Sequence, residues 1–188
     1  GNTYEEACVQ GISEVFERYL EFKAFAHLDE EFIELDLTTL KNPVIQNMID
    51  GIEQSNNIIR IFDLSYTFHA PVLMSAIFNK MNSRIYLDFG SAPEFDIAVE
   101  RIITESYQGM TTLNDFDYDI QQPMANSAES VLMRQGGNSP FTICQFPETI
   151  FLNTKKMSCY ESPYFLYDNS MSNTEMLEWY KGIVKDLN

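Results

Sequence analysis

The chain has 188 residues, a length that fits one domain with a sizeable core. Its residues are 45% hydrophobic and 13% aromatic, a composition that excludes a disordered chain. A formal net charge of −16 argues against binding to nucleic acid or to an anionic membrane, because both favour basic protein surfaces.

The first predicted element is a helix that begins after Thr3 and runs to about Leu28. Thr3 and Glu6 have the T-x-x-E spacing of a capping box, in which each residue binds a free amide of the first turn. Apolar side chains recur at steps of three and four residues and predict one buried face, made of Val9, Ile12, Phe16, Tyr19 and Leu20.

The opposite side of this helix carries an acidic stripe. At ~100° per residue, the stripe contains Glu6, Gln10, Ser13, Glu14, Glu17 and Glu21, with Arg18 at its edge. Stacked like charges repel each other, and a solvated face usually relieves this repulsion with lysine. An all-acidic stripe beside one arginine therefore suggests a cation such as Mg²⁺ together with an anionic ligand. The alternative is an acidic surface that simply faces water.

The middle of the chain predicts a sheet. The alternating run F-I-E-L-D-L, within residues 29–41, is a candidate short strand, and Pro43 suits the first turn of a second helix. Three apolar runs at residues 58–64, 72–78 and 84–89 predict an antiparallel meander. His69 falls in the connector between the first two of these strands and is assigned no role.

A further helix is predicted after the meander. Ser91 can cap it, Pro93 fits its first turn, Glu94 completes a capping box, and Gly109 can end it. Arg101 and Glu105 share one side of this helix, and their spacing alone favours an ordinary surface ion pair over a functional role.

The remainder, from residue 110 onward, is harder to interpret. A helix over residues 128–134 is plausible, and the aromatic residues of 159–167 fit a packed edge or a partner surface. Ser172 and Glu175 begin a last helix, whose buried face we expect to contain Met176, Leu177, Trp179, Tyr180, Ile183 and Val184.

The cysteines and histidines form no recognisable site. Cys8, Cys144 and Cys159 are scattered without a C-x-x-C motif, and the two histidines lie far apart, so we expect neither a zinc site nor a disulfide framework. No apolar run approaches the ~18 residues of a transmembrane helix, and no signal-peptide pattern is present. The sequence therefore predicts a cytoplasmic protein.

Two stretches resemble the YcaO family. Residues 1–19 read G-N-T-Y-E-E-A-C-V-Q-G-I-S-E-V-F-E-R-Y and are similar to the family signature, an alanine- and glutamate-rich helix that ends in S-E-x-x-E-R. Residues 89–109 match F-G-x-x-P-x-F-x-x-A-x-E-R-x-x-x-E-x-x-Q-G, a pattern of the stand-alone members linked to methylthiolation of a ribosomal protein. The resemblance covers residues 1–109 well and 110–188 weakly.

The resemblance implies an α+β fold, with an antiparallel sheet packed against helices. It also implies that residues 1–188 form a single YcaO-like domain fragment, cut at both ends, which would be inactive alone. YcaO enzymes use ATP and Mg²⁺ to activate a backbone amide. A nucleophile attacks the carbonyl carbon, the resulting oxyanion takes the γ-phosphoryl group, and phosphate then leaves.

The resemblance also assigns site residues, one position at a time. It implies Mg²⁺ contacts for Glu6, Glu14, Glu17 and Glu105. It implies nucleotide contacts for Arg18, Arg101, Glu6 and Glu14. No general base can be named.

The implied partners are a peptide or protein substrate, a ribosomal-protein methylthiotransferase, and a second subunit in a homodimer. No nucleic acid or membrane partner is expected. The alternative function is an interaction module that keeps the YcaO scaffold without catalysis.

Overall fold

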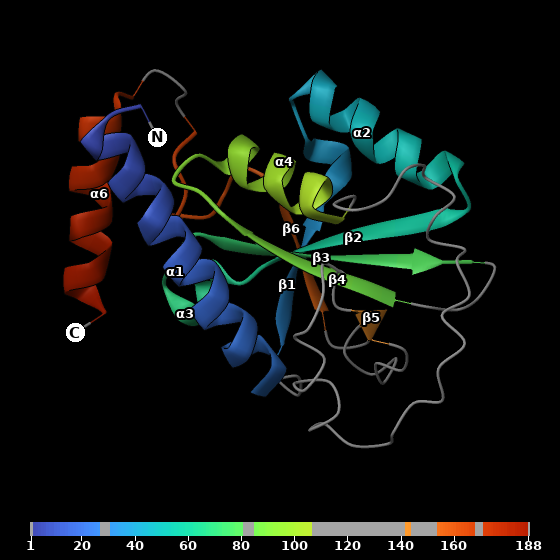
Figure 1. Ribbon diagram of the computed structural model, residues 1–188. Helices are drawn as coiled ribbons and strands as arrows, with labels where there is room; N and C mark the ends of the chain where they lie inside the picture. The colour runs from blue at the N-terminus through green and yellow to red at the C-terminus, as the bar shows by residue number, and fades with distance from the viewer. Residues whose placement is uncertain are drawn as a thin grey trace.

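The computed structural model describes residues 2–26, 31–80, 85–106, 142–143, 154–167 and 171–187. Within these residues the fold is α+β, with one six-stranded sheet and helices on both of its faces (Figure 1). The strands are β1 (Phe32–Asp36), β2 (Asn57–Asp63), β3 (Val72–Asn79), β4 (Ile85–Ser91), β5 (Thr142–Ile143) and β6 (Thr154–Ser158). The helices are α1 (Tyr4–Ala26), α2 (Pro43–Gln54), α3 (Ser65–Phe68), α4 (Phe95–Ser106) and α6 (Asn173–Asp186), with a short 3₁₀ helix, η1, at Leu37–Thr39.

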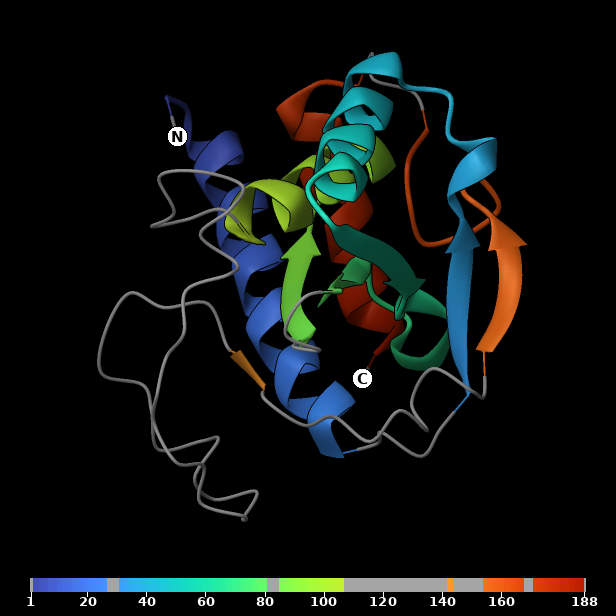
Figure 2. The ribbon, with the colours of Figure 1, turned by 90° about the vertical axis from the view of Figure 1, so that its right-hand side faces the viewer.

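The strands lie in the spatial order β5-β4-β3-β2-β1-β6. The predicted antiparallel meander is confirmed, because β3 pairs antiparallel with both β2 and β4, and Ile59, Ile77 and Tyr86 lie in one row across the three strands. The pair β1 and β6 differs from the predicted antiparallel sheet: these strands are parallel, and their arrows point the same way in Figure 2.

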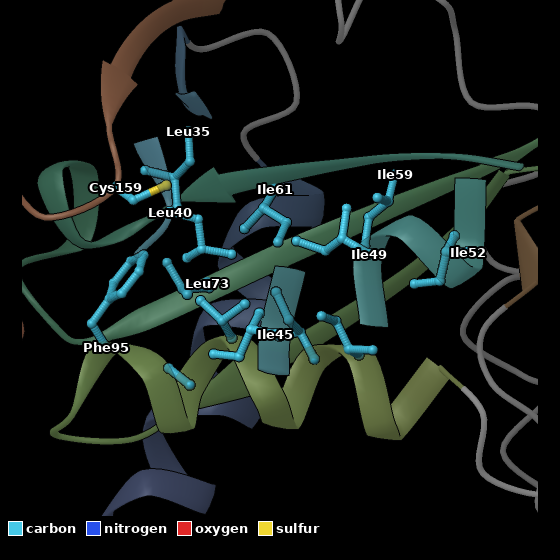
Figure 3. Packing of buried hydrophobic residues seen from close by; sticks show 14 of the residues in the cluster. Leu35, Leu40, Ile45, Ile49, Ile52, Ile59, Ile61, Leu73, Phe95 and Cys159 are labelled. Atoms are coloured by element: carbon cyan, nitrogen blue, oxygen red, sulfur yellow. The ribbon is translucent and has the colours of Figure 1, made fainter. Parts of the chain in front are cut away.

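Helices bury both faces of the sheet. Leu73 and Ile77 of β3 pack into the cluster beneath α2 and α4, whereas Met74 and Ala76 of the same strand pack beneath α1 and α6. A strand that is buried on both faces has apolar residues at nearly every position, which explains the continuous apolar run of β3. Figure 3 shows the cluster under α2, where isoleucines of the helix meet those of β2.

The aromatic residues after β6 close this cluster at one end. The ring of Phe95, the first residue of α4, lies 5.1 Å from the Tyr160 ring and 5.6 Å from the Phe165 ring, centroid to centroid. The Cys159 amide donates to Thr39 Oγ1 at 2.9 Å and joins this segment to η1. Of the two readings of the aromatic segment, the structure therefore supports the packed edge.

α1 begins with the predicted cap, with one difference. The Glu6 amide donates to Thr3 Oγ1 at 3.1 Å, while the Glu6 carboxylate accepts from the amide of Asn2, not from that of Thr3. Val9, Phe16 and Leu20 are buried as predicted. Tyr19 was expected in this buried face and is instead 55% exposed.

The predicted start of the helix after the meander is wrong. Ser91 does not cap a helix, because it is the last residue of β4 and pairs with Val72 of β3. α4 begins only at Phe95, whose amide donates to the Leu166 carbonyl at 3.0 Å. The residue that resembles the cap, Ser91, therefore belongs to the sheet.

The last helix agrees with its capping signal. Ser172 and Glu175 form a complete capping box at the start of α6, and Leu177 and Tyr180 are buried. Val184, predicted to be buried, is 40% exposed. The predicted helix at 128–134, the stop at Gly109, and Cys144 lie outside the described residues.

No helix in the described parts of the chain combines the length and the apolar character needed to cross a membrane.

Candidate functional site

The acidic stripe of α1 lies beside the outer edge of β4. β5 pairs only with Ile85 and Tyr86, so within the described residues the rest of β4 has no neighbouring strand on that side. α1 packs against one face of β4 and α4 against the other (Figure 1). Charges from all three elements act on one another here, and they belong to Glu14, Glu17, Glu21, Asp88, Arg101 and Glu105.

Glu17 and Arg101 both bind the backbone of Ser91. The Ser91 amide donates to Glu17 Oε2 at 3.3 Å, and Arg101 Nη1 donates to the Ser91 carbonyl oxygen at 2.7 Å. These contacts satisfy peptide groups at the end of β4. They also hold a carboxylate of α1 and a guanidinium of α4 at the same residue.

The Glu17 carboxylate has an excess of negative charge around it. Burial raises the pKa of Glu17 to about 7, and the charges of Glu14 and Glu105 contribute to the rise. The hydrogen bond from Ser91 and the charge of Arg101 lower the pKa without cancelling the effect. A bound cation would favour the ionised carboxylate, so the electrostatics suit a cation.

Asp88 is a member of this group that the sequence analysis missed. Burial raises the pKa of Asp88 to about 6, although the Ser106 hydroxyl donates to its carboxylate at 2.7 Å. Glu105 and Glu21 also raise it. The available signal was a lone carboxylate in an otherwise apolar strand, between Leu87 and Phe89.

Glu14 and Arg18 pair with each other at the exposed edge of the stripe. Arg18 Nη2 lies 2.6 Å from Glu14 Oε1, and both side chains are more than half exposed. The hydrogen bond to Glu14 raises the pKa of Arg18. An exposed pair of this kind contributes little stability, so it leaves both groups available to a ligand.

Glu6 lies apart from the other predicted residues. It precedes Glu17 by 11 residues, which corresponds to ~16 Å along the helix axis. Its carboxylate accepts from the amide of Asn2 at 2.6 Å and from the side chain of Gln10 at 3.5 Å. The structure thus brings Glu14, Glu17, Arg101 and Glu105 into one region and leaves Glu6 at the beginning of α1.

The donor set fits Mg²⁺ bound together with phosphate. Among the described residues, no three Asp, Glu, His or Cys side chains form a group that could hold a metal by themselves. Mg²⁺ needs only one or two protein carboxylates when substrate phosphates and water fill its remaining positions. Glu17 and Glu105, beside Arg101, meet that smaller requirement.

Ser13, the serine of S-E-x-x-E-R, faces the core and not the acidic stripe. It is fully buried, and its hydroxyl donates to the Val9 carbonyl at 2.9 Å. The same hydroxyl lies 2.7 Å from the Tyr180 hydroxyl of α6. Ser13 therefore joins α1 to α6.

Two further residues, His69 and Cys159, lie outside the candidate site. His69 Nδ1 is hydrogen-bonded to the Tyr164 hydroxyl at 2.5 Å on the surface. Cys159 is buried, and burial raises the pKa of its thiol, which keeps it protonated and unreactive.

Residues 1–186 match the sequence profile of a protein family described as YcaO cyclodehydratase, ATP- and Mg²⁺-binding. Over 118 residues the chain is 36% identical to the ribosomal protein S12 methylthiotransferase accessory factor YcaO of Escherichia coli. Over the same length it is 38% identical to an uncharacterised protein of Haemophilus influenzae. Each match covers 62% of this chain and 20% of the relative.

Solved structures support the fold. The heterocyclase TruD superimposes with a TM-score of 0.63 at 18% identity, over 99% of this chain and 24% of TruD. A heterocyclase in complex with substrate and cofactor gives a TM-score of 0.55, also at 18% identity, over 98% of this chain and 23% of its own. The chain thus spans about a fifth to a quarter of the length of the proteins that it matches.

Proposed function

The chain belongs to the YcaO family, and we propose that α1 and α4 form part of an Mg²⁺–ATP site. The observation that carries this proposal is the group of carboxylates from α1, β4 and α4 around Arg101, in which the pKa of Glu17 is raised to about 7. The arginine side chains of this site do not balance the negative charge of its carboxylates. Mg²⁺ would supply the missing positive charge, and a phosphate group would bind to Arg101.

The proposed roles follow the placement of the side chains. Glu17 and Glu105 provide carboxylate oxygens for Mg²⁺, with Glu14 beside them at the exposed edge. Arg101 and Arg18 offer planar guanidinium groups, which bind phosphate oxygens as a fork. When bound, Mg²⁺–ATP supplies the phosphoryl group, and the metal offsets the phosphate charges. Glu6 is too distant from Glu17 to share one ion with it, so we assign it a separate metal or nucleotide contact.

We extend the proposal to the reaction of the whole protein, activation of a backbone amide of a peptide or protein. The family description as an ATP- and Mg²⁺-binding cyclodehydratase supports this activity. The 36% identity to the Escherichia coli accessory factor supports a role beside a ribosomal-protein methylthiotransferase. A homodimer is part of the same proposal.

A second candidate function is a binding module without catalysis. It is favoured by the way in which the key residues are already engaged: Glu17 and Arg101 hold Ser91, and Arg18 pairs with Glu14. In this alternative, the contacts with Ser91 stabilise the end of β4, and the protein binds no nucleotide.

Calorimetric titration with Mg²⁺–ATP separates the two candidates. The measurement compares the natural full-length protein with its Glu17→Ala and Glu53→Ala variants. Glu53 is an exposed residue on α2, outside both segments that resemble the family, so its variant loses the same charge away from the site. We expect Glu17→Ala to weaken binding at least tenfold and Glu53→Ala to leave it unchanged. Equal affinity in all three proteins, or no binding by the unaltered protein, would contradict the nucleotide site.

A further inference from the structure

Ser91 has a side-chain hydroxyl that is buried without a hydrogen-bond partner. The residue is 0% exposed, and its Oγ atom has no partner among the described residues. Its backbone amide and carbonyl, in contrast, bind Glu17 and Arg101. A buried hydroxyl that lacks a partner costs free energy, so an acceptor is expected close to it.

The Ser91 hydroxyl lies on the face of the sheet that α1 and α6 cover. Side chains alternate along a strand, and Leu87 and Phe89 of β4 pack into the cluster beneath these two helices. Ser91 is two residues after Phe89 and therefore points to the same face. The helices α1 and α6 pack side by side there (Figure 1), and Glu17 of α1 reaches the Ser91 amide.

The nearest candidate acceptor is the hydroxyl of Tyr180, on α6. This residue is fully buried, and its hydroxyl oxygen lies 2.7 Å from Ser13 Oγ. Ser13 is one helical turn before Glu17, so the phenol lies beside the turn of α1 that contacts Ser91. Burial raises the pKa of Tyr180 to about 12, while the hydroxyls of Ser13 and Ser91 and the charge of Arg101 act in the opposite direction. The phenol is thus close to all three groups.

The protons of these hydroxyls fix the direction of the hydrogen bonds. A serine hydroxyl carries one proton, and that of Ser13 is donated to the Val9 carbonyl at 2.9 Å. In the bond between Ser13 and Tyr180, the donor is therefore Tyr180. The Tyr180 oxygen keeps lone pairs that can accept a hydrogen bond, and the Ser91 hydroxyl has a proton without an acceptor.

We propose that Ser91 donates a hydrogen bond to the Tyr180 hydroxyl, and that Tyr180 is thereby a positioning residue of the candidate site. The bonds run from Ser91 to Tyr180, then to Ser13, and end at a backbone carbonyl of α1. Hydrogen bonds in such a chain polarise one another, which strengthens each of them. Tyr180 thus holds the end of β4 at which Glu17 and Arg101 meet. The positioning role rests on the proposed Mg²⁺–ATP function.

Packing alone does not explain the hydroxyl of Tyr180. The Tyr180 ring lies 5.6 Å from the Phe16 ring, centroid to centroid, and a phenylalanine would fill the same space. The other buried residue of α6 is the apolar Leu177. The α6 helix also lies outside the two segments that resemble the family, so their motifs give no sign of a contribution from it.

Hydrogen–deuterium exchange of the natural full-length protein tests the bond between Ser91 and Tyr180. We expect Ser91→Ala to lower the protection of the α6 amides about fivefold, which corresponds to one lost hydrogen bond. Tyr180→Phe should lower it further, and the double variant should exchange no faster than Tyr180→Phe. A Ser91 hydroxyl without a partner predicts the opposite, because alanine then removes an unsatisfied group. Unchanged or increased protection in Ser91→Ala would therefore overturn the proposal.

Calorimetric titration with Mg²⁺–ATP tests the positioning role. We expect Tyr180→Phe and Ser91→Ala each to weaken binding about fivefold, as the loss of one hydrogen bond allows. Ser13→Ala and Leu177→Ala are the controls and should leave the affinity unchanged. Ser13→Ala breaks the other bond of the same phenol, and Leu177→Ala loosens the same helix without removing a hydroxyl. Equal weakening in all four variants would assign the effect to the packing of α6 and refute the positioning role.

The two measurements separate this inference from the nucleotide site. If the unaltered protein binds no Mg²⁺–ATP, the proposed function and the positioning role both fail, while hydrogen exchange still decides whether Ser91 is bonded to Tyr180. If the unaltered protein binds Mg²⁺–ATP and Tyr180→Phe binds it equally well, the positioning role alone fails.

Discussion

Ser13 belongs to the S-E-x-x-E-R segment, yet its contacts lie within the core. Its hydroxyl is buried between the Val9 carbonyl and the Tyr180 hydroxyl, and burial raises the pKa of Tyr180 to about 12. A phenol with such a pKa stays protonated and remains a hydrogen-bonding partner at all physiological pH values. A serine in a signature motif can therefore serve the packing of two helices, while its glutamate neighbours belong to the proposed nucleotide site.

Replacing Ser13 tests this separation of roles. We expect Ser13→Ala to lower the free energy of unfolding by about 1 kcal/mol, because the buried Tyr180 hydroxyl loses a partner. Urea denaturation measures the change. Tyr180→Phe is the companion variant, and the double variant should cost less than the sum of the two single changes. A loss of Mg²⁺–ATP affinity in Ser13→Ala without a loss of stability would contradict the structural role.

Among the elements, α4 and β4 are held in close approach by one glycine. A Cβ atom at Gly90 would lie 2.6 Å from Ile102 Cγ2 and 3.1 Å from the Ala98 carbonyl oxygen. Because Gly90 has no side chain, α4 packs directly on β4, and Arg101 comes within reach of Ser91. The geometry of the candidate site therefore depends on this glycine.

Two alanine substitutions should have opposite effects on stability. Gly90→Ala should destabilise the protein by about 1–3 kcal/mol, because the new methyl group overlaps Ile102 and backbone atoms. Gly11→Ala should stabilise the protein by up to about 1 kcal/mol, because nothing lies within 4 Å of the position that its Cβ atom would take and the change removes a flexible residue from α1. Thermal and urea denaturation measure both. A tolerated Gly90→Ala would show that α4 can shift away from β4.

The sequence predicted those elements whose local pattern matches their environment. α1, α2, α6 and the meander have clear periodicity or caps, and each is confirmed. The start of α4 was misplaced because the capping signal at Ser91 competes with strand pairing to Val72, which only the sheet reveals. β6 was missed because the run T-K-K-M-S has no apolar alternation and its partner strand is distant in sequence.

The site shows the same limit. The helical spacing predicted the acidic stripe and the shared side of Arg101 and Glu105, because both follow from local geometry. Asp88 could not be found in this way, since its burial depends on α4 covering β4. The distance between Glu6 and Glu17 was already contained in the predicted helix, because 11 residues correspond to ~16 Å along its axis, but the resemblance assigned both residues to Mg²⁺ without regard to that distance.

At the scale of the whole molecule, buried carboxylates should make the protein more stable in mild acid. Burial raises the pKa of both Asp63 and Asp88 from 3.8 to about 6, and that of Glu17 from 4.5 to about 7. Between the ordinary pKa and the raised pKa of each group, the native state binds more protons than the unfolded state. The stability that these groups contribute is therefore present at low pH and is lost as the pH rises through the window.

We expect the free energy of unfolding to be about 3 kcal/mol higher at pH 5.5 than at pH 8. Urea denaturation at a series of pH values measures this difference. Asp88→Asn should flatten the dependence and raise the stability at pH 8, while the Ser106 hydroxyl keeps an acceptor. Stability that increases from pH 5.5 to pH 8 would contradict the buried, under-neutralised state of these carboxylates.

The parallel pairing of β1 with β6 also bears on the order of folding. Glu34 on β1 accepts a hydrogen bond from Thr154 on β6, 120 residues later in the chain. The meander of β2, β3 and β4 needs only short loops, whereas closing a loop of this length carries a large entropic cost before any contact forms. The meander can therefore assemble early and serve as the template on which the last strand adds, so variants in β6 should mainly accelerate unfolding and leave the folding rate nearly unchanged.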